Sequence, residues 1–289
     1  NVIYRNEFQK RAVEDTRLGI PLLFAYDVIH GYRTVYPISL GQACSFNTNL
    51  VEKACRFAAK EASDTGINWT FSPMIDVARE PRWGRVSEGY GEDPLVNSAF
   101  CIASVKGYQG NDLTQSDTIA ACLKHFVGYS ESVAGIDYAY SDISERAMWE
   151  TYLPPYLAGI NAGAATIMSG FNDINGVPAV CNDFYLNQIL RKKWGFNGVV
   201  VSDWNAIRQL KNQGFSNSQH QSRIQNNMNY YYMVRSTLCQ GSKIAKTWWV
   251  KILVGIFLGI SRNFRGKPGG IWQVLGRFWA GLGLSLIHI

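Results

Sequence analysis

The sequence predicts an α/β fold, a (β/α)8 barrel of the TIM type that is incomplete in this chain. Strand-like apolar runs alternate with helical patterns over residues 1–213. The runs are almost continuously apolar, which is typical of parallel strands buried on both faces. Reactive polar residues close nearly every run: Asp27, Asp76, Lys124 and His125, Asn172 and Asp173, and Asp203. Barrel enzymes build their active sites from the C-terminal ends of several strands.

Five strands and four helices are expected in chain order. The predicted strands span 22–28, 67–76, 118–126, 165–171 and 198–204. Asn47 is expected to cap the first helix, which Gly66 terminates. The other helices are expected near 93–108, over 144–162 with a break at Pro154 and Pro155, and over 183–194. No GxGxxG motif opens a helix after a strand, which argues against a dinucleotide-binding fold.

Charge is distributed unevenly along the chain. All 22 acidic residues lie at or before Asp203, where 17 Lys and Arg residues leave a net charge of −5. Residues 204–289 hold 11 basic residues and no acidic one. The overall charge of +6 therefore belongs to one end, and it does not predict a nucleic-acid partner for the whole protein.

The alternating pattern stops after about Gly214. Gln and Asn clusters follow, then three consecutive tyrosines at 230–232. The apolar run at 250–260 is shorter than the about 20 residues needed to span a bilayer. We expect that the reading frame was lost near Gly214, so that 214–289 is an aberrant basic tail without a native fold. A basic aromatic helix on a membrane surface is the alternative.

The cysteines form no CxxC pair, and we interpret them as small buried hydrophobes rather than disulfide partners or metal ligands. They are Cys44, Cys55, Cys101, Cys122, Cys181 and Cys239. The chain begins with Asn and shows no signal peptide. Since its start is expected to be missing, this gives no information on export.

Asp203 is a candidate catalytic carboxylate. A retaining glycosidase uses one carboxylate to attack the anomeric carbon and another carboxyl group to protonate the leaving oxygen. Asp203 closes the fifth predicted strand, where a carboxylate can be held rigidly, and Trp204 beside it would stack on a sugar ring. A helix N-cap is the alternative role for Asp203.

Charged side chains at other strand ends are candidates for binding sugar hydroxyls, because charge-assisted hydrogen bonds are the stronger ones. Asp27 follows the first strand and can accept from two adjacent hydroxyls. Lys124 and His125 close the third strand. Neighbours in a strand face opposite sides, so a turn is expected to begin there. For His125, a core histidine bonded to the backbone is the alternative.

Three arginines lie in the stretch VAREPRWGRVSEGYGEDP. One of them is expected to point at the ligand, while the others pair with Glu80, Glu88 or Glu92. Surface salt bridges are the alternative for Arg79 and Arg82. The glycines of this stretch lack the P-loop spacing, so no phosphate is expected.

Several stretches, in this order and spacing, resemble glycoside hydrolase family 3, and most of all its periplasmic β-glucosidase branch. They are LGIPLLFAYDVIHG, DVAREPRWGRVSEGYGEDP, CLKHFVGY, SERAMWETYLPPY, FNDINGVPA and GFNGVVVSDW, within Gln9 to about Gly214. The resemblance implies a retaining β-glucosidase that releases terminal non-reducing β-D-glucosyl residues from β-glucosides and oligosaccharides. Such an enzyme needs no cofactor and no metal, because carboxylates carry the chemistry.

The resemblance also implies roles for single residues. Asp203 would be the nucleophile, Trp204 would line the −1 subsite, and the glucose-binding residues there would be Asp27, Arg85, Lys124 and His125. Phe171 stands where some relatives carry tyrosine. The loop KHFVGYSES lacks the second His and the Asp of the KHFxGHGDT loop of β-N-acetylglucosaminidases, so that mechanism is not expected.

The resemblance implies parts beyond this chain. Family members have an earlier segment that supplies the first barrel strand and helix, and the glucosidase branch takes its acid/base Glu from a later α/β sandwich domain. The last barrel strands are not recognisable after Asp203 either. We therefore expect this chain alone to be inactive or nearly so, and its open sheet edges to favour aggregation.

Alternative functions stay open. A metal-dependent hydrolase needs several histidine and carboxylate ligands, but only His30 and His125 precede the tail. A non-catalytic sugar-binding fragment is a second alternative, and a β-xylosidase of the same family is a third. We expect a sugar substrate as partner, neither nucleic acid nor membrane, and a periplasmic or secreted location. Aglycone, linkage and oligomeric state are not predicted.

Overall fold

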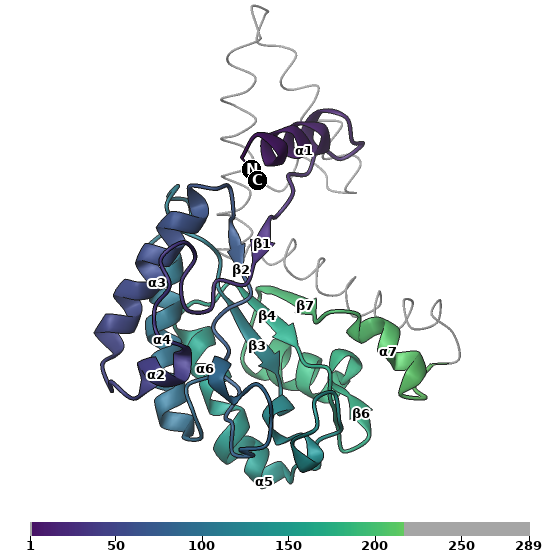
Figure 1. The fold of residues 1–289 in the computed structure, drawn as a ribbon. Coiled ribbons are helices and arrows are strands. Elements are labelled where there is room, and N and C mark those ends of the chain that lie inside the picture. Colours follow the sequence, from purple (N-terminus) through teal and green to yellow (C-terminus); the bar gives the residue numbers. More distant parts are fainter. Residues whose placement is uncertain (1, 217–289) are drawn as a thin grey trace, which may run out of the picture. The chain divides into compact units, whose positions relative to one another are not determined.

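The structure is a computed structural model that describes residues 2–216 (Figure 1). The predictions for the tail concern residues outside this range: the lost reading frame, the surface helix and the interpretation of Cys239. Everything below refers to the described residues.

Helices and strands alternate along the chain. The helices are α1 (Val2–Glu14), α2 (Ser39–Ala43), α3 (Thr48–Ser63), α4 (Pro94–Gln109), α5 (Glu145–Ala147), α6 (Pro154–Asn161) and α7 (Ala206–Asn212). The strands are β1 (Ala25–Tyr26), β2 (Trp69–Thr70), β3 (Cys122–Phe126), β4 (Thr166–Ser169), β5 (Asp173–Ile174), β6 (Val177–Pro178) and β7 (Val199–Ser202). Short 3-10 turns lie at Val86–Glu88, Tyr129–Glu131, Val133–Gly135 and Ala179–Cys181, and wider π-helical turns lie at Met148–Tyr152 and Phe184–Lys193. Helix α1 has no counterpart among the predicted elements.

The five predicted strands are present, and they are parallel. Strand β1 pairs with β2, and β4 pairs with β3 on one side and with β7 on the other. Parallel bridges from Trp69 to Ala120 and from Met74 to Lys124 connect β2 with the segment that leads through β3. The strands thus follow one another in chain order. They are shorter than predicted, because an apolar run forms a ladder only where a neighbour lies beside it: Leu22 and Leu23 are exposed and precede β1.

Helices α3, α4 and α6 form a packed layer beside the strands (Figure 1). The close approach of α3 and α4 requires Gly107, since a Cβ there would lie 2.4 Å from the Glu52 carbonyl oxygen. Cys55, Cys101 and Cys122 are buried, as predicted. Cys44 is exposed, and its interpretation as a buried hydrophobe was wrong: it follows the short helix α2, whose last buried residue is Ala43.

The helix signals in the sequence are confirmed at their caps. Asn47 Oδ1 accepts a hydrogen bond from the Leu50 amide at the start of α3. Ser144 Oγ accepts from the Ala147 amide at the start of α5. The break expected at Pro154 and Pro155 is present, because α6 begins at Pro154 after a π-helical turn. The segment predicted as a helix over 183–194 is wound as a π-helix.

The sequence places Asn172 and Asp173 among the polar residues at strand ends, but in the structure they do not join the others. Strands β5 and β6 form a hairpin whose turn is Asn175-Gly176, both at positive φ, as a two-residue turn of this kind requires. Asp173 Oδ1 accepts from the Gly176 amide within that turn. Asn172 is buried and donates to Val127 O and Ser141 Oγ. Both side chains therefore hold local structure.

The N-terminal ends of β3 and β4 are joined by a single side chain of α4. Gln109 Oε1 accepts from the amides of Ala121 and Ala165, at 3.1 and 2.9 Å, just before the two strands. Its Nε2 donates to the Gly163 carbonyl at 2.9 Å. We call this arrangement the Gln109 clamp. It satisfies two fully buried backbone amides, and it fixes the spacing of the strands at this end.

Candidate active site

Charged side chains gather at the other end of the strands, where β1, β3 and β7 finish. Asp27 directly follows β1, and its Oδ1 lies 2.8 Å from Lys124 Nζ. The Lys124 side chain is only 4% exposed, whereas the Asp27 side chain is 55% exposed. A buried cation is thus held by a carboxylate that still faces solvent. A carboxylate in that position can accept hydrogen bonds from an incoming polyol.

Arg85 enters the same cluster from the turn at Val86–Glu88. Its Nε and Nη2 donate to the two Glu88 carboxylate oxygens at 2.7 and 3.0 Å, a bidentate pair. Glu88 also lies 4.0 Å from Lys124 Nζ, so one carboxylate serves two cations. Burial lowers the pKa of Arg85, but Glu88, Asp76 and Tyr129 together outweigh it and keep the pKa above its ordinary value. Burial would raise the pKa of Glu88, but Arg85 keeps it below its usual range.

The pairing of the three arginines differs in part from the expectation. Arg82 forms the expected surface pair with Glu80. Arg85, the arginine assigned to the subsite, is itself the partner of Glu88. The Arg85 guanidinium also lies 5.7 Å from the centroid of the Tyr129 ring. It therefore reaches the cluster as part of an ion pair, not as a free cation.

Lys124 and His125 both contribute to the cluster, but without the turn that the sequence suggested. Strand β3 continues to Phe126, and its register with β4 shifts between Lys124 and Phe126. The peptide bond between Lys124 and His125 is cis. Lys124 and His125 therefore both reach the cluster from within β3, where the register of the strand shifts, and not from a turn after it.

His125 is almost fully buried and is held by Asp76. Asp76 Oδ2 lies 3.0 Å from the backbone amide nitrogen of His125 and 2.8 Å from Nδ1 of its ring. Burial raises the pKa of Asp76 to about 7, against the lowering effect of Arg85. Burial, Arg85 and Lys124 together hold the pKa of His125 well below its ordinary value. The alternative of a core histidine with only a backbone partner is wrong, because both ring nitrogens face carboxylates.

Asp203 follows β7 and faces His125. Its Oδ2 lies 3.4 Å from His125 Nε2, is inaccessible to solvent and has no hydrogen-bond partner. Its Oδ1 accepts from the Trp204 amide at 2.6 Å. Asn205, not Asp203, is the residue that precedes α7 as N-cap. The Asp203 side chain therefore does not cap α7. Its Oδ2 points into the cluster without a hydrogen-bond partner.

Electrostatics in the cluster act on Asp203 in both directions. Burial raises the pKa of the Asp203 carboxyl above its ordinary value. His125, the Trp204 amide, Arg85 and Lys124 oppose that rise. The cations thus favour the ionised form that a nucleophile requires.

Aromatic side chains surround the cluster. Trp204 is 78% exposed beside Asp203, so its ring face is free to meet a ligand. Tyr129 packs edge-on against His125 and Phe171, and its hydroxyl donates to Asp137. Phe171, where some relatives carry tyrosine, is buried.

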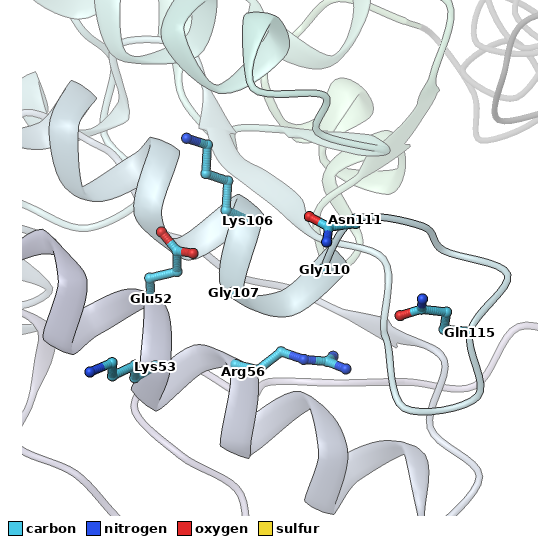
Figure 2. Close-up of a pocket in the computed structure, with 8 residues that line it drawn as sticks. All are labelled: Glu52, Lys53, Arg56, Lys106, Gly107, Gly110, Asn111 and Gln115. Atoms are coloured by element: carbon cyan, nitrogen blue, oxygen red, sulfur yellow. The ribbon is translucent and has the colours of Figure 1, made fainter.

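Two cavities lie away from the cluster. One of about 330 Å³ is lined by Arg79, Glu92, Pro94 and Thr151. The other, of about 540 Å³, lies between α3 and α4 (Figure 2) and is lined by Glu52, Lys53, Arg56, Lys106, Gly107, Gly110, Asn111 and Gln115. Arg56 is already paired with Asp117. Neither cavity contains a predicted site residue. We therefore assign the candidate active site to the charged cluster, on the chemistry of its side chains and not on cavity volume.

Within residues 2–216, no three His, Cys, Asp or Glu side chains are grouped to hold a metal ion. Within the same range, no helix has both the length and the apolar character needed to cross a bilayer.

Sequence reasoning missed two members of the cluster. Asp76 was noticed only as a polar strand end, and Glu88 only as an arginine partner. Asp76 could have been found from the same signal that identified Asp27 and Asp203, an acid after an apolar run. Glu88 gives no comparable signal, because its position depends on how the loop after Arg85 folds back towards Lys124.

Comparison with known proteins gives one consistent family. The profile described as glycosyl hydrolase family 3 N terminal domain matches residues 4–244. The periplasmic beta-glucosidase of Salmonella typhimurium is 44% identical over 208 residues, which cover 72% of this chain and 27% of that protein. A beta-xylosidase of Formosa agariphila is 39% identical over 222 residues, which cover 72% of this chain and 31% of that protein.

Solved structures agree with the sequence matches. The beta-glucosidase from Listeria innocua in complex with isofagomine superposes with a TM-score of 0.77 and 35% sequence identity. The match covers 93% of this chain and 40% of that one. This chain therefore spans between about a quarter and two fifths of the length of these relatives.

Proposed function

The chain belongs to glycosyl hydrolase family 3, and we propose that the protein containing it is a retaining β-glucosidase in which Asp203 is the nucleophile. Asp203 attacks the anomeric carbon of a terminal β-D-glucosyl residue and forms a covalent glycosyl-enzyme, which water then hydrolyses. The observation that carries the proposal is the buried Oδ2 of Asp203. This oxygen has no hydrogen-bond partner and lies in the cluster of charged side chains, 3.4 Å from His125 Nε2.

Other residues of the cluster hold the sugar. Asp27 accepts hydrogen bonds from adjacent hydroxyls and Lys124 donates to a hydroxyl oxygen, while His125 lines the subsite beside Asp203. Arg85, fixed by Glu88, places a positive charge beside the subsite, and Trp204 stacks on the ring face. No cofactor enters this mechanism.

The acid/base group lies outside this set. Glu88 is the remaining glutamate of the cluster, and it is ionised and committed to Arg85, so it is a poor proton donor. We propose that a later domain of the whole protein supplies the acid, as the family resemblance implies. In that case this chain alone binds the sugar but turns it over slowly or not at all.

We propose that residues 1–213 are a partial (β/α)8 barrel. The parallel strands in chain order, with helices beside them, and the likeness to solved family members support closure into a barrel in the whole protein. Residues 214–289 are proposed to be an out-of-frame tail. A periplasmic or secreted location is proposed from the name of the Salmonella relative.

Trapping of the glycosyl-enzyme tests the proposal. The gene is re-sequenced across codons 195–230, and the full-length protein is assayed on p-nitrophenyl β-glucoside and then incubated with a 2-deoxy-2-fluoro-β-glucoside. Hydrolysis, followed by a mass increase on the peptide that contains Asp203, is expected. Label on another residue would overturn the nucleophile assignment. Faster cleavage of the β-xyloside would favour the alternative named for the Formosa relative, and glucose binding without cleavage would favour a sugar-binding protein.

A further inference from the structure

We infer that Asp76 is a positioning residue, which holds the His125 ring so that Nε2 presents a hydrogen to the Asp203 carboxylate. The inference rests on the proposed function only in naming Asp203 the nucleophile. The three side chains form a line: Asp76 Oδ2 lies 2.8 Å from Nδ1 of His125, and Nε2 of the same ring lies 3.4 Å from Asp203 Oδ2.

The position of the hydrogen on the ring follows from the two carboxylates. A neutral imidazole has one N–H and one bare nitrogen. If the hydrogen were on Nδ1, the bare Nε2 would face the bare Oδ2 of Asp203, and two acceptors would repel each other in a buried site. With the hydrogen on Nε2, the contact to Asp203 is attractive. Catalytic hydrogen bonds are often long before substrate binds, and we expect this one to shorten from 3.4 Å once it does.

Asp76 can supply what the Nε2–H form of the ring requires. Nδ1 is then bare and needs a donor, which a protonated Asp76 provides through Oδ2. The same oxygen still accepts from the His125 backbone amide at 3.0 Å. Tyr156 completes the carboxyl group by donating to Oδ1 at 3.3 Å. Burial favours the neutral form of both partners, since it raises the pKa of Asp76 and lowers that of His125.

Other charged groups face the pair and do not alter this arrangement. Arg85, Lys124 and Glu88 all act on His125, and the two cations oppose a positive charge on its ring. Arg85 lowers the pKa of Asp76 while Glu88 raises it. The pair is therefore held neutral with one shared hydrogen, and Nε2–H helps to keep Asp203 ionised against its own burial.

Asp76→Asn tests the inference with almost no change in volume. The backbone amide of His125 requires an acceptor where Oδ2 now stands, so the Asn side-chain oxygen occupies that place. That oxygen then accepts from Nδ1–H, which leaves Nε2 bare towards Asp203. The tautomer of His125 is determined at pH 6 from the ¹⁵N NMR spectrum of full-length protein labelled at histidine. The signals that are absent from the spectrum of the His125→Gln variant identify those of His125.

We expect Nε2–H in the unmodified protein, Nδ1–H in Asp76→Asn, and a fall in kcat of about 100-fold with a smaller change in KM, the cost of a misplaced group at the site. Tyr156→Phe is the matched control, since it removes the bond to the other oxygen and should leave the tautomer unchanged. Asp76→Glu retains the carboxyl group and should restore Nε2–H if the Asn variant does not fold.

Two results would overturn the inference: Nδ1–H in the unmodified protein, or Nε2–H retained in Asp76→Asn. An unmodified protein that cleaves no glucoside but shows the expected exchange of tautomer would remove the proposed function and leave the role of Asp76 on the ring intact. Glucosidase activity in the unmodified protein, together with an unchanged tautomer in Asp76→Asn, would support the proposed function and overturn the role of Asp76.

Discussion

Buried polar groups are paired differently at the two ends of the parallel strands. At the N-terminal ends, the Gln109 clamp joins β3 and β4 through neutral hydrogen bonds, and each polar atom of the Gln109 amide is used. At the C-terminal ends, charges from Asp27, Lys124 and Asp203 crowd together, and one carboxylate oxygen has no partner.

The difference separates stability from chemistry within one sheet. A buried amide network in which every group is satisfied stabilises the fold and has nothing left to offer a ligand. A buried carboxylate oxygen without a short hydrogen bond costs stability and can still accept one from a ligand. The two ends should therefore respond differently to substitution: one in unfolding, the other in catalysis.

Asp203→Ala should give the largest effect. In the complete protein it removes the covalent step, so turnover of p-nitrophenyl β-glucoside should fall by several orders of magnitude. The midpoint of urea unfolding should hold or rise, because an unpaired buried oxygen is lost. A rate close to that of the unmodified protein would show that another residue is the nucleophile.

Gln109→Ala should have the converse effect. It leaves the buried amides of Ala121 and Ala165 without acceptors, so the free energy of unfolding should drop by about 2–5 kcal/mol. Gln42→Ala, at a half-buried glutamine whose side chain makes one solvent-exposed hydrogen bond to Pro37, is the control and should change little. Urea titration followed by tryptophan fluorescence measures both, and equal midpoints would refute the role of the clamp.

Asp27→Asn should weaken transition-state binding by a smaller amount. The variant loses one charge-assisted acceptor and the partner of Lys124, and kcat/KM should fall by about 10- to 100-fold. An unchanged kcat/KM would place Asp27 outside the site.

Lys124→Gln should shift the pH dependence of kcat/KM. Burial raises the pKa of Asp203, and Lys124 is among the groups that lower it again. Without this cation the pKa rises further, so the acid limb of the profile should move to higher pH. Arg82→Gln removes a cation that is paired at the surface with Glu80, and it should leave the limb in place. A limb that stays put in both variants would mean that Asp203 does not set it.

Much of this fold could be predicted because its signals are local. Apolar runs gave the five strands, Asn47 and Ser144 gave helix starts, and Pro154 gave a break. Strand lengths were overestimated, since they depend on a neighbour far away in the chain. The π-helical turns and α1 gave no clear local signal.

The candidate site was predicted in its residues more than in its connections. All six assigned residues lie at or beside the cluster, because acids and bases after apolar runs meet at one edge of a parallel sheet. The partners of those residues could not be predicted. Glu88 and Asp76 bind Arg85 and His125 through loops whose paths no periodicity describes. Asn172 and Asp173 carried the same signal but serve a hairpin instead.

The Gln109 clamp has a consequence for hydrogen exchange. Two amides in different strands, those of Ala121 and Ala165, share one acceptor atom on one rotatable side chain. A single rotation of that side chain releases both at once, without unfolding either strand. Their deuterium uptake should therefore be correlated, with similar protection factors, although 44 positions separate them in the sequence.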